Sequence, residues 1–202
     1  MPNADFFARF GLFVAKDFFD ADLCSKLMSE VRSGTDHAAT VGIKGTTYGV
    51  DENVRKTKWA EVSTATVSDV EGRLLALRPM LEKHFNVTLS GCQEPQFLVY
   101  REGDFFRAHR DSKREPDAAE FTKERQVSAV VFLNDESEVA GPDVYGGGSL
   151  TFYGLMDEPQ GKSIGFPLVG EAGLLVAFRP ELVHEVTPVT HGERYTVVTW
   201  FR

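Results

Sequence analysis

Cysteine is scarce in this chain of 202 residues, which contains Cys24 and Cys92 and no others. Two cysteines are too few for a disulfide framework, and their separation excludes the C-x-x-C spacing of zinc and redox motifs. We therefore expect a protein of a reducing compartment.

Long hydrophobic runs are also missing. No apolar run is longer than residues 174–178, far short of the ~20 residues that a membrane-spanning helix needs. The first ten residues mix acidic and basic side chains with apolar ones, unlike the basic head and apolar stretch of a secretory signal. We expect a soluble, cytoplasmic protein without a membrane partner.

Basic residues are outnumbered, since 22 Lys and Arg stand against 30 Asp and Glu, for a net charge of −8. A nucleic acid would meet net repulsion, so we expect no nucleic-acid partner. Apolar residues make up 42% of the chain, including 16 Phe, which excludes a disordered chain. This length fits one domain, so we expect residues 1–202 to fold as a unit.

Residues 1–92 show mixed helical and strand patterns. Residues 10–15 are typical of a short strand, and Asp20 is placed to cap a helix over 21–31, where apolar residues recur at helical spacing. Residues 35–66 have no clear period and remain unassigned.

A second helix is predicted to start at Ser68 or Asp69 and to run to about His84. Pro79 should bend or shorten its end, because proline lacks the N–H that a helix interior needs.

From Gln93 onward, short β-type runs alternate with glycine, proline and acidic clusters. This alternation of strand-like runs and turn residues predicts antiparallel sheets in a sandwich or barrel. Two segments, 112–125 and 134–148, are expected to be mobile. The predicted strands are 96–100, 105–109, 126–133, 149–152, 173–178, 182–186 and 194–201.

His109 and Asp111 form an H-x-D pair at the end of one predicted strand, and His184 lies in another. Taken alone, the pair is also typical of a surface loop. A lone histidine between valines, such as His184, is also typical of a buried core. Together, two His and one carboxylate are the ligand set of the facial triad, which binds Fe(II) and leaves open positions.

Arg194 follows His184 by ten residues, beyond a turn at 188–192, so we expect the two strands to form a hairpin. Arg194 is an even number of residues away from Thr196 and Trp200, so the three side chains share one face of the strand, which would place all three inside the barrel. An outward Arg194 paired with a surface glutamate is the alternative. An interior guanidinium needs an anion, and beside a metal site this suits a dicarboxylate.

These residues stand in a specific order. Tyr100-x-x-Gly103-x-x-Phe106-x-x-His109-x-Asp111 is followed by the strand at 126–134, by Gly147-Gly148-x-Leu150-x-Phe152, and by His184, Arg194 and Trp200. The chain thereby resembles the prolyl 4-hydroxylase-like branch of the Fe(II)/2-oxoglutarate-dependent oxygenases. The resemblance implies a mainly β fold: a double-stranded β-helix, or jelly roll, over 93–202, supported by the helical and mixed region 1–92.

The resemblance also implies roles for single residues. His109, Asp111 and His184 match the iron ligands, and Arg194 matches the residue that clamps the distal carboxylate of 2-oxoglutarate. Tyr100 matches a tyrosine that hydrogen-bonds this co-substrate, although a half-buried strand tyrosine looks the same in sequence.

Further along the same strands, Trp200 matches an aromatic of the metal cavity and equally fits a core tryptophan. Phe132 stands where some relatives have a second tyrosine, and it cannot donate a hydrogen bond. A hydroxyl of Ser128 or Thr196 is expected to assist Arg194 instead.

Arg55 and Lys56 are candidates for the substrate side of the barrel mouth, and the segment 112–125 is a candidate lid; both also fit solvated loops. The resemblance implies hydroxylation of a C–H bond with release of succinate and CO2, using Fe(II), 2-oxoglutarate and O2, with ascorbate as a candidate reductant. The expected substrate is a prolyl or other residue in a peptide or protein, or alternatively a free amino acid or small metabolite. A non-catalytic sensor or binding module is the third interpretation.

Overall fold

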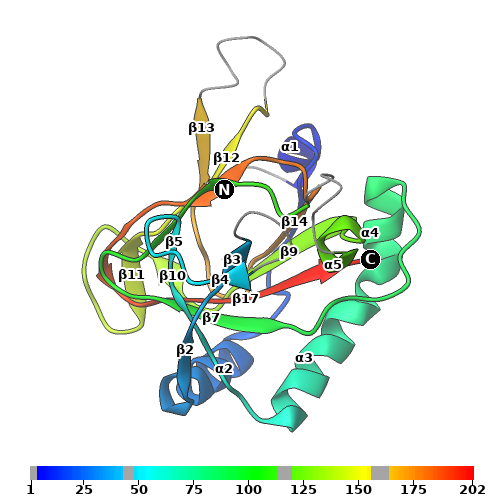
Figure 1. Cartoon of the computed structure of the whole chain (residues 1–202). Helices are drawn as coiled ribbons and strands as arrows, with labels where there is room; N and C mark the ends of the chain where they lie inside the picture. The colour runs from blue at the N-terminus through cyan, green and yellow to red at the C-terminus, as the bar shows by residue number, and fades with distance from the viewer. Residues whose placement is uncertain (1–3, 43–47, 113–119, 156–163) are drawn as a thin grey trace.

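The computed structural model describes residues 4–42, 48–112, 120–155 and 164–202. Two antiparallel sheets face each other, and helices cover the outer side of the larger sheet (Figure 1). Within these ranges the helices are α1 (Ala4–Ala8), α2 (Ala21–Ser33), α3 (Thr64–Ala76), α4 (Arg78–Phe85) and α5 (Glu120–Lys123).

The larger sheet contains seven strands in the order β1-β14-β9-β17-β7-β6-β2. Strands from the first 60 residues form its two edges, β1 at one edge and β6 and β2 at the other. Their bounds are β1 (Phe13–Ala15), β14 (Leu175–Phe178), β9 (Val127–Phe132), β17 (Arg194–Phe201), β7 (Gln96–Tyr100), β6 (Lys58–Ala60) and β2 (Asp36–Ala38).

The smaller sheet contains five strands in the order β13-β12-β15-β8-β5. They are β13 (Gly165–Leu168), β12 (Leu150–Tyr153), β15 (His184–Val186), β8 (Phe105–His109) and β5 (Arg55–Lys56). Two minor sheets complete the described strands. One contains β10 (Asp135–Glu136), β11 (Val144–Gly147) and β16 (Val189–Gly192), and the other β3 (Val41–Gly42) and β4 (Tyr48–Gly49).

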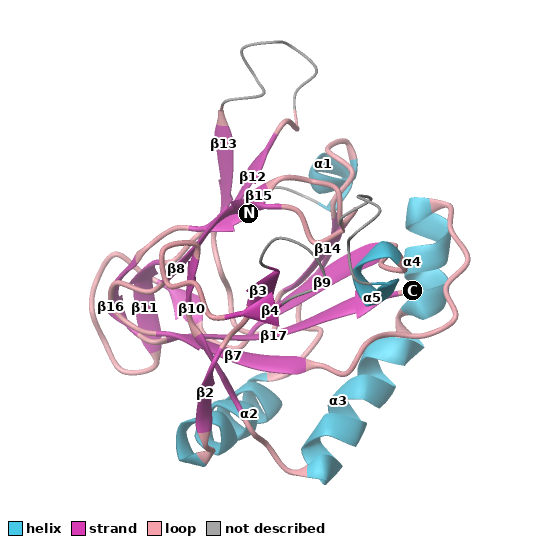
Figure 2. Ribbon diagram, in the orientation of Figure 1, coloured by secondary structure: helices cyan, strands magenta, loops and turns pink. Residues whose placement is uncertain are grey.

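Alternation along the strands of the larger sheet divides the core in two. In β17, Tyr195 and Val197 face the helices, whereas Arg194 and Thr196 face the smaller sheet. Figure 2 shows α2, α3 and α4 grouped along one side of the strands. The inner layer packs Leu98 and Phe132 and other residues of the larger sheet against residues of the smaller sheet such as Phe152. The predicted mainly β, jelly-roll architecture with supporting helices is confirmed.

The first predicted helix is confirmed. The Asp20 side chain accepts a hydrogen bond from the Leu23 amide at 2.8 Å, as an N-cap does, and α2 follows. The helix buries Leu23, Leu27, Met28 and Val31, which are the residues at helical spacing, together with Cys24.

The predicted start of the second helix is wrong. α3 begins after Ser63, whose hydroxyl accepts from the Thr66 amide at 3.2 Å, so Ser68 and Asp69 lie inside the helix. A separate helix, α4, begins after Leu77 and carries Pro79 in its first turn, where the missing N–H costs nothing. Proline therefore starts a new helix here instead of shortening the end of the previous one.

The predicted hairpin between the strands of His184 and Arg194 is also wrong. β15 pairs with β8 and β12 in the smaller sheet, whereas β17 pairs with β7 and β9 in the larger one. The chain passes between the sheets through β16, which pairs with β11. His184 and Arg194 therefore reach the interior from opposite walls.

The unassigned segment 35–66 contributes strands to both main sheets, through β2 and β6 in one and β5 in the other. The segment 134–148 contains β10 and β11, and part of the candidate lid 112–125 falls outside the described residues. In the described ranges, no helix has the length and apolar character needed to cross a membrane.

Candidate metal centre and cavity

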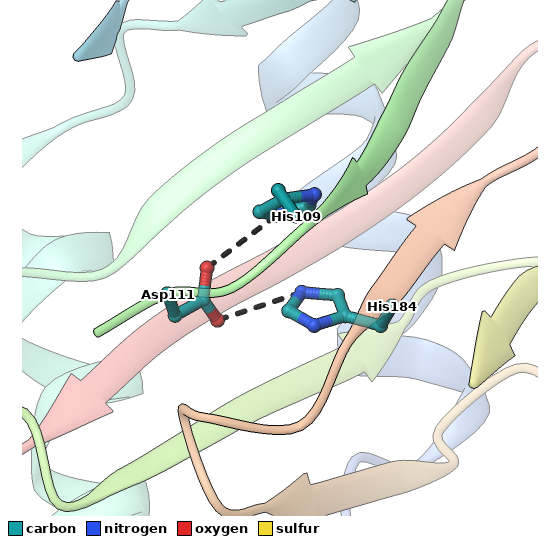
Figure 3. Close-up of side chains that lie close together, drawn as sticks. All are labelled: His109, Asp111 and His184. Atoms are coloured by element: carbon teal, nitrogen blue, oxygen red, sulfur yellow. Dashed lines mark ion pairs between the residues drawn. The ribbon is translucent and has the colours of Figure 1, made fainter. Parts of the chain in front are cut away.

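The structure brings His109, Asp111 and His184 together between the two sheets (Figure 3). His109 ends β8 and His184 begins β15, and the two are direct partners across these antiparallel strands. Asp111 follows in the bend after β8. One ligand atom from each residue lies within 4.8 Å of the others.

Both imidazoles are oriented by the backbone. His109 Nδ1 contacts the Arg107 carbonyl at 2.8 Å, and His184 Nδ1 contacts the Leu182 carbonyl at 2.9 Å. Because a carbonyl oxygen accepts and cannot donate, each Nδ1 carries the proton in the neutral ring. Each Nε2 then presents its lone pair to the centre, as metal-binding histidines do.

Asp111 is held from three sides. Its amide donates to the Pro180 carbonyl at 2.8 Å, and its own carbonyl accepts from Arg125 at 3.0 Å. The Ser128 hydroxyl donates to Asp111 Oδ2 at 2.7 Å. The carboxylate oxygens lie 3.5 Å from His109 Nε2 and 3.6 Å from His184 Nε2.

His184 is buried, while His109 and Asp111 are partly exposed, and this burial changes how the centre titrates. Desolvation, with the neighbouring His109 imidazole, lowers the pKa of His184 to about 4. Burial alone would raise the pKa of Asp111, but the two imidazoles and Arg125 hold it below its usual range. At neutral pH the site therefore offers a carboxylate and a neutral His184 ring, the protonation states that bind a metal.

Aromatic rings enclose the histidines. Phe106 stacks on His109 with ring centroids 3.5 Å apart, and Phe178 lies edge-on to His184 at 4.7 Å. Such packing fixes both rings and keeps water from that side.

A cavity of about 630 Å³ opens at this centre. Nine candidate site residues of the sequence analysis line it, whereas Lys56 does not. The nine are His109, Asp111, His184, Arg194, Tyr100, Thr196, Arg55, Trp200 and Ser128.

Arg194 lies in the cavity wall and is 1% exposed. Its Nη1 donates to the Thr196 hydroxyl at 3.3 Å, and the rings of Tyr100 and Phe132 lie 5.1 Å from its guanidinium carbon. Among the described residues no carboxylate pairs with it, and the alternative of a surface ion pair is not observed. A buried guanidinium without a counter-ion is costly, so this wall is suited to a bound anion.

The other predicted residues divide by position. Trp200 lies under Arg125, whose guanidinium carbon is 3.6 Å from the centroid of the Trp200 ring. Arg55 lies over Phe106 at 4.7 Å, at the outer part of the cavity. Lys56 instead pairs with Asp104 at 3.3 Å and does not line the cavity.

Ser128 differs from its expected position. Its hydroxyl binds Asp111 at the metal end and not the anion near Arg194, which corrects that expectation. Thr196 remains the hydroxyl beside Arg194.

The sequence analysis did not predict that Ser128 and Arg125 contact Asp111. Alternation along β9 was available as a signal, because it places Ser128, Val130 and Phe132 on the inner face. The contact with Arg125 depends on how the chain returns after Ser112, which no local pattern indicates.

Two His and one carboxylate on one side of a cavity fit a divalent ion such as Fe(II), because they leave coordination positions open toward the cavity. Arg194 on the opposite wall fits an anionic group of a molecule that reaches the metal. The donor set is thus compatible with a metal and a chelating dicarboxylate.

Comparisons with known proteins point the same way. A PKHD-type hydroxylase of Maricaulis maris is 35% identical over 103 residues, or 51% of this chain and 39% of its own length. A PKHD-type hydroxylase of Shewanella frigidimarina is 28% identical over 160 residues, 78% of this chain and 65% of its own. The matches thus cover less than two thirds of these relatives.

Solved structures match over nearly the whole chain. A Pseudomonas putida prolyl-4-hydroxylase superposes with a TM-score of 0.70 at 28% identity, covering 98% of this chain and 96% of that one. A Trichoplax adhaerens prolyl hydroxylase, solved with a hypoxia inducible factor peptide, gives a TM-score of 0.68 at 17% identity over 95% of this chain and 83% of that one, which shows a shared fold. The model of the 2OG-Fe(II) oxygenase superfamily matches residues 95–202, and the chain belongs to that superfamily.

Proposed function

We propose that this protein is an Fe(II)- and 2-oxoglutarate-dependent hydroxylase of a prolyl or other residue in a peptide or protein. The observation that carries the proposal is a single cavity with His109, Asp111 and His184 in one wall and the uncompensated Arg194 in the other. A ligand that binds a metal at one end and Arg194 at the other would use the polar groups of both walls.

His109, Asp111 and His184 would hold the iron through two Nε2 atoms and a carboxylate oxygen. When bound, the iron supplies the redox chemistry by which O2 oxidises 2-oxoglutarate to succinate and CO2 and hydroxylates a C–H bond. The chain orients the reactants and excludes water, through backbone-fixed imidazoles and a wall of Phe residues. Ascorbate is the reductant we propose for returning oxidised iron to Fe(II).

Arg194 would bind the distal carboxylate of 2-oxoglutarate, since a guanidinium offers two parallel donors to one carboxylate. Thr196 orients the guanidinium. Tyr100 is the direct cross-strand partner of Arg194 and lies in the same wall, within reach of the same molecule. The co-substrate then takes the depth of the cavity and leaves the outer part for the substrate.

A peptide substrate is favoured by the apolar side chains at the outer part of the cavity. Trp59 and Phe121 line it and remain 37% and 44% exposed, and Val62 and Pro95 lie in the same lining. Flat apolar and aromatic surface suits a proline ring and its neighbours. The similar proteins described above are named as hydroxylases, and two of the solved structures as prolyl hydroxylases.

A free amino acid or small metabolite is the second candidate. It is favoured by two further guanidinium groups in the cavity lining, those of Arg55 and Arg125. Either could bind the carboxylate of a small acid. We place the activity in the cytoplasm, in keeping with two buried free thiols, Cys24 and Cys92.

The first test is an anaerobic titration of the Fe(II) protein with 2-oxoglutarate, followed by its visible charge-transfer absorption. The band should appear in the parent, vanish in His184→Ala, and need much more 2-oxoglutarate in Arg194→Ala. Arg101→Ala is the matched control, because Arg101 pairs with Asp36 and Glu193 outside the cavity. A folded, iron-loaded parent without the band would reject the oxygenase function and leave a binding module.

Succinate release then separates the two substrate classes. Proline-containing peptides should stimulate it, and free amino acids should not. Stimulation by a free amino acid alone would replace the peptide proposal by the small-molecule one.

A further inference from the structure

The outer part of the cavity is backed by a histidine that the metal centre does not use. His37, in β2, stacks on Trp59 of β6 with ring centroids 4.5 Å apart and an interplanar angle of 25°. Trp59 lines the cavity and His37 does not, so the imidazole supports the indole from outside the lining. The stack thus connects the edge of the larger sheet to the part of the cavity that is left for the substrate.

The imidazole of His37 is held in place by Glu61. His37 Nε2 donates to Glu61 Oε1 at 2.9 Å, and the two side chains are 40% and 59% exposed. Glu61 is itself tied to the chain before β2, since its amide donates to the Thr35 carbonyl at 3.1 Å. An exposed pair of this kind adds little to folding stability, so stability alone does not account for it. Its direct effect is to fix the orientation of a ring that is stacked on the cavity wall.

The strand register places this stack in one row with the wall that contains Arg194. His37 and Trp59 are direct partners across β2 and β6, and Trp59 is the partner of Leu98 in β7. Leu98 is in turn the partner of Thr196, which orients Arg194. Direct partners project from the same face of a sheet, so the row runs from the sheet edge to this wall. Trp59 lies two strands from Thr196, roughly 10 Å at the usual strand spacing.

We propose that His37 is a positioning residue for the peptide substrate. It holds the Trp59 indole in the orientation in which the ring contacts a residue that flanks the hydroxylated one. The indole is 37% exposed, and each side chain that becomes immobilised on binding lowers the affinity. A ring that a stacked neighbour has already fixed avoids this loss. This inference rests on the proposed function and adds to it a residue outside the cavity lining.

The test measures succinate release by the Fe(II) enzyme with two probes. One is an acetylated and amidated nine-residue peptide with a central proline, two leucines on each side of it and alanine at the ends. The other is N-acetylproline amide, which has no flanking residues. In His37→Ala the KM for the nine-residue peptide should rise roughly fivefold, because the indole is no longer held. The kcat with this peptide and the KM values for 2-oxoglutarate and N-acetylproline amide should not change.

Two further variants separate positioning from a general effect on the fold. His37→Phe keeps a flat ring that can stack on Trp59, and its KM for the nine-residue peptide should be within about twofold of that of the parent. His84→Ala is the matched control, because this histidine also packs against an aromatic ring, that of Phe13 at 5.4 Å, but lies outside the cavity lining. It should leave all of these constants unchanged.

An unchanged KM for the nine-residue peptide in His37→Ala would overturn the positioning role and leave the proposed function intact. A lower kcat with both probes that His37→Phe does not restore would also overturn it, since that result indicates a structural role. A parent that turns over no proline-containing peptide would reject the proposed function and this inference together.

Discussion

His184 and Asp111 both resist protonation in the folded chain, for different reasons. Burial disfavours the charged form of His184, whereas the neighbouring His184, His109 and Arg125 stabilise the charged form of Asp111. Both effects keep the centre ready for a metal at neutral pH, and both oppose folding in acid.

Stability of the metal-free protein should therefore fall between pH 6.5 and pH 4. In this window the unfolded chain protonates His184 and the folded chain, with a pKa of about 4, does not. The loss should be on the order of 2 kcal/mol by pH 5, measured by urea unfolding. His184→Gln should remove that part of the loss, whereas His37→Gln at the surface should keep it. An identical pH dependence in parent and His184→Gln would contradict the prediction.

Ser128 acts on the metal centre through Asp111. Its hydroxyl holds one carboxylate oxygen at 2.7 Å and thereby fixes the direction in which the other oxygen points. Ser128→Ala should weaken Mn(II) binding by roughly tenfold, as is usual when a partner of a metal ligand is removed. Calorimetric titration measures this change. Ser90→Ala, in a serine that bonds the Arg202 carbonyl at the surface, should bind Mn(II) as the parent does.

Among the helices, the start of α3 shows how a side-chain contact from elsewhere selects a cap. Glu30 of α2 accepts from the Ser63 amide and from the Thr66 hydroxyl, each at 2.6 Å, and thus ties α2 to the first turn of α3. Ser68 is an equally good capping residue by type, but among the described residues Glu30 contacts Ser63 and Thr66 instead. The local sequence allows both starts, and Glu30 favours one.

Ser63→Ala should destabilise the protein by about 1 kcal/mol, the usual effect of losing an N-cap. Ser68→Ala, the same change five residues on, should leave stability unchanged or slightly raise it, because alanine is the better residue inside a helix. Urea unfolding of both variants measures the difference. Equal destabilisation by the two substitutions would contradict this cap assignment.

Across the whole molecule, the support region 1–92 and the jelly-roll region 93–202 are separate in sequence but share the same sheets in the structure. β1, β2 and β6 from the first 92 residues are strands of the larger sheet, and β5 is a strand of the smaller one. The helix-covered core also combines both parts, for example Leu74 of α3 with Val197 of β17. Our expectation of a single domain over 1–202 remains a prediction, and this interleaving supports it.

A fragment of residues 93–202 should therefore not fold alone, because it leaves the outer face of the larger sheet bare of α2, α3 and α4 and leaves three strand edges unpaired, those of β14, β7 and β8. Circular dichroism and thermal unfolding should show no cooperative transition, in contrast to the full chain. A cooperative transition in the isolated fragment would show that the two parts are separate domains.

The sequence by itself determined the strands that contain the functional residues and the face of each strand on which their side chains lie. Strands 96–100, 105–109 and 194–201 have the predicted bounds, and Arg194 faces inward with Thr196 and Trp200 as alternation required. The order of His109, Asp111, His184 and Arg194 was enough to indicate the family, because it preserves the ligand set and its spacing.

Tertiary structure alone decided which strands pair and what surrounds each functional group. The strands of His184 and Arg194 lie ten residues apart yet belong to opposite sheets, because pairing depends on partners such as β8 and β7 that are distant in sequence. Short-range patterns fix which face a side chain takes, and long-range packing fixes what it meets there.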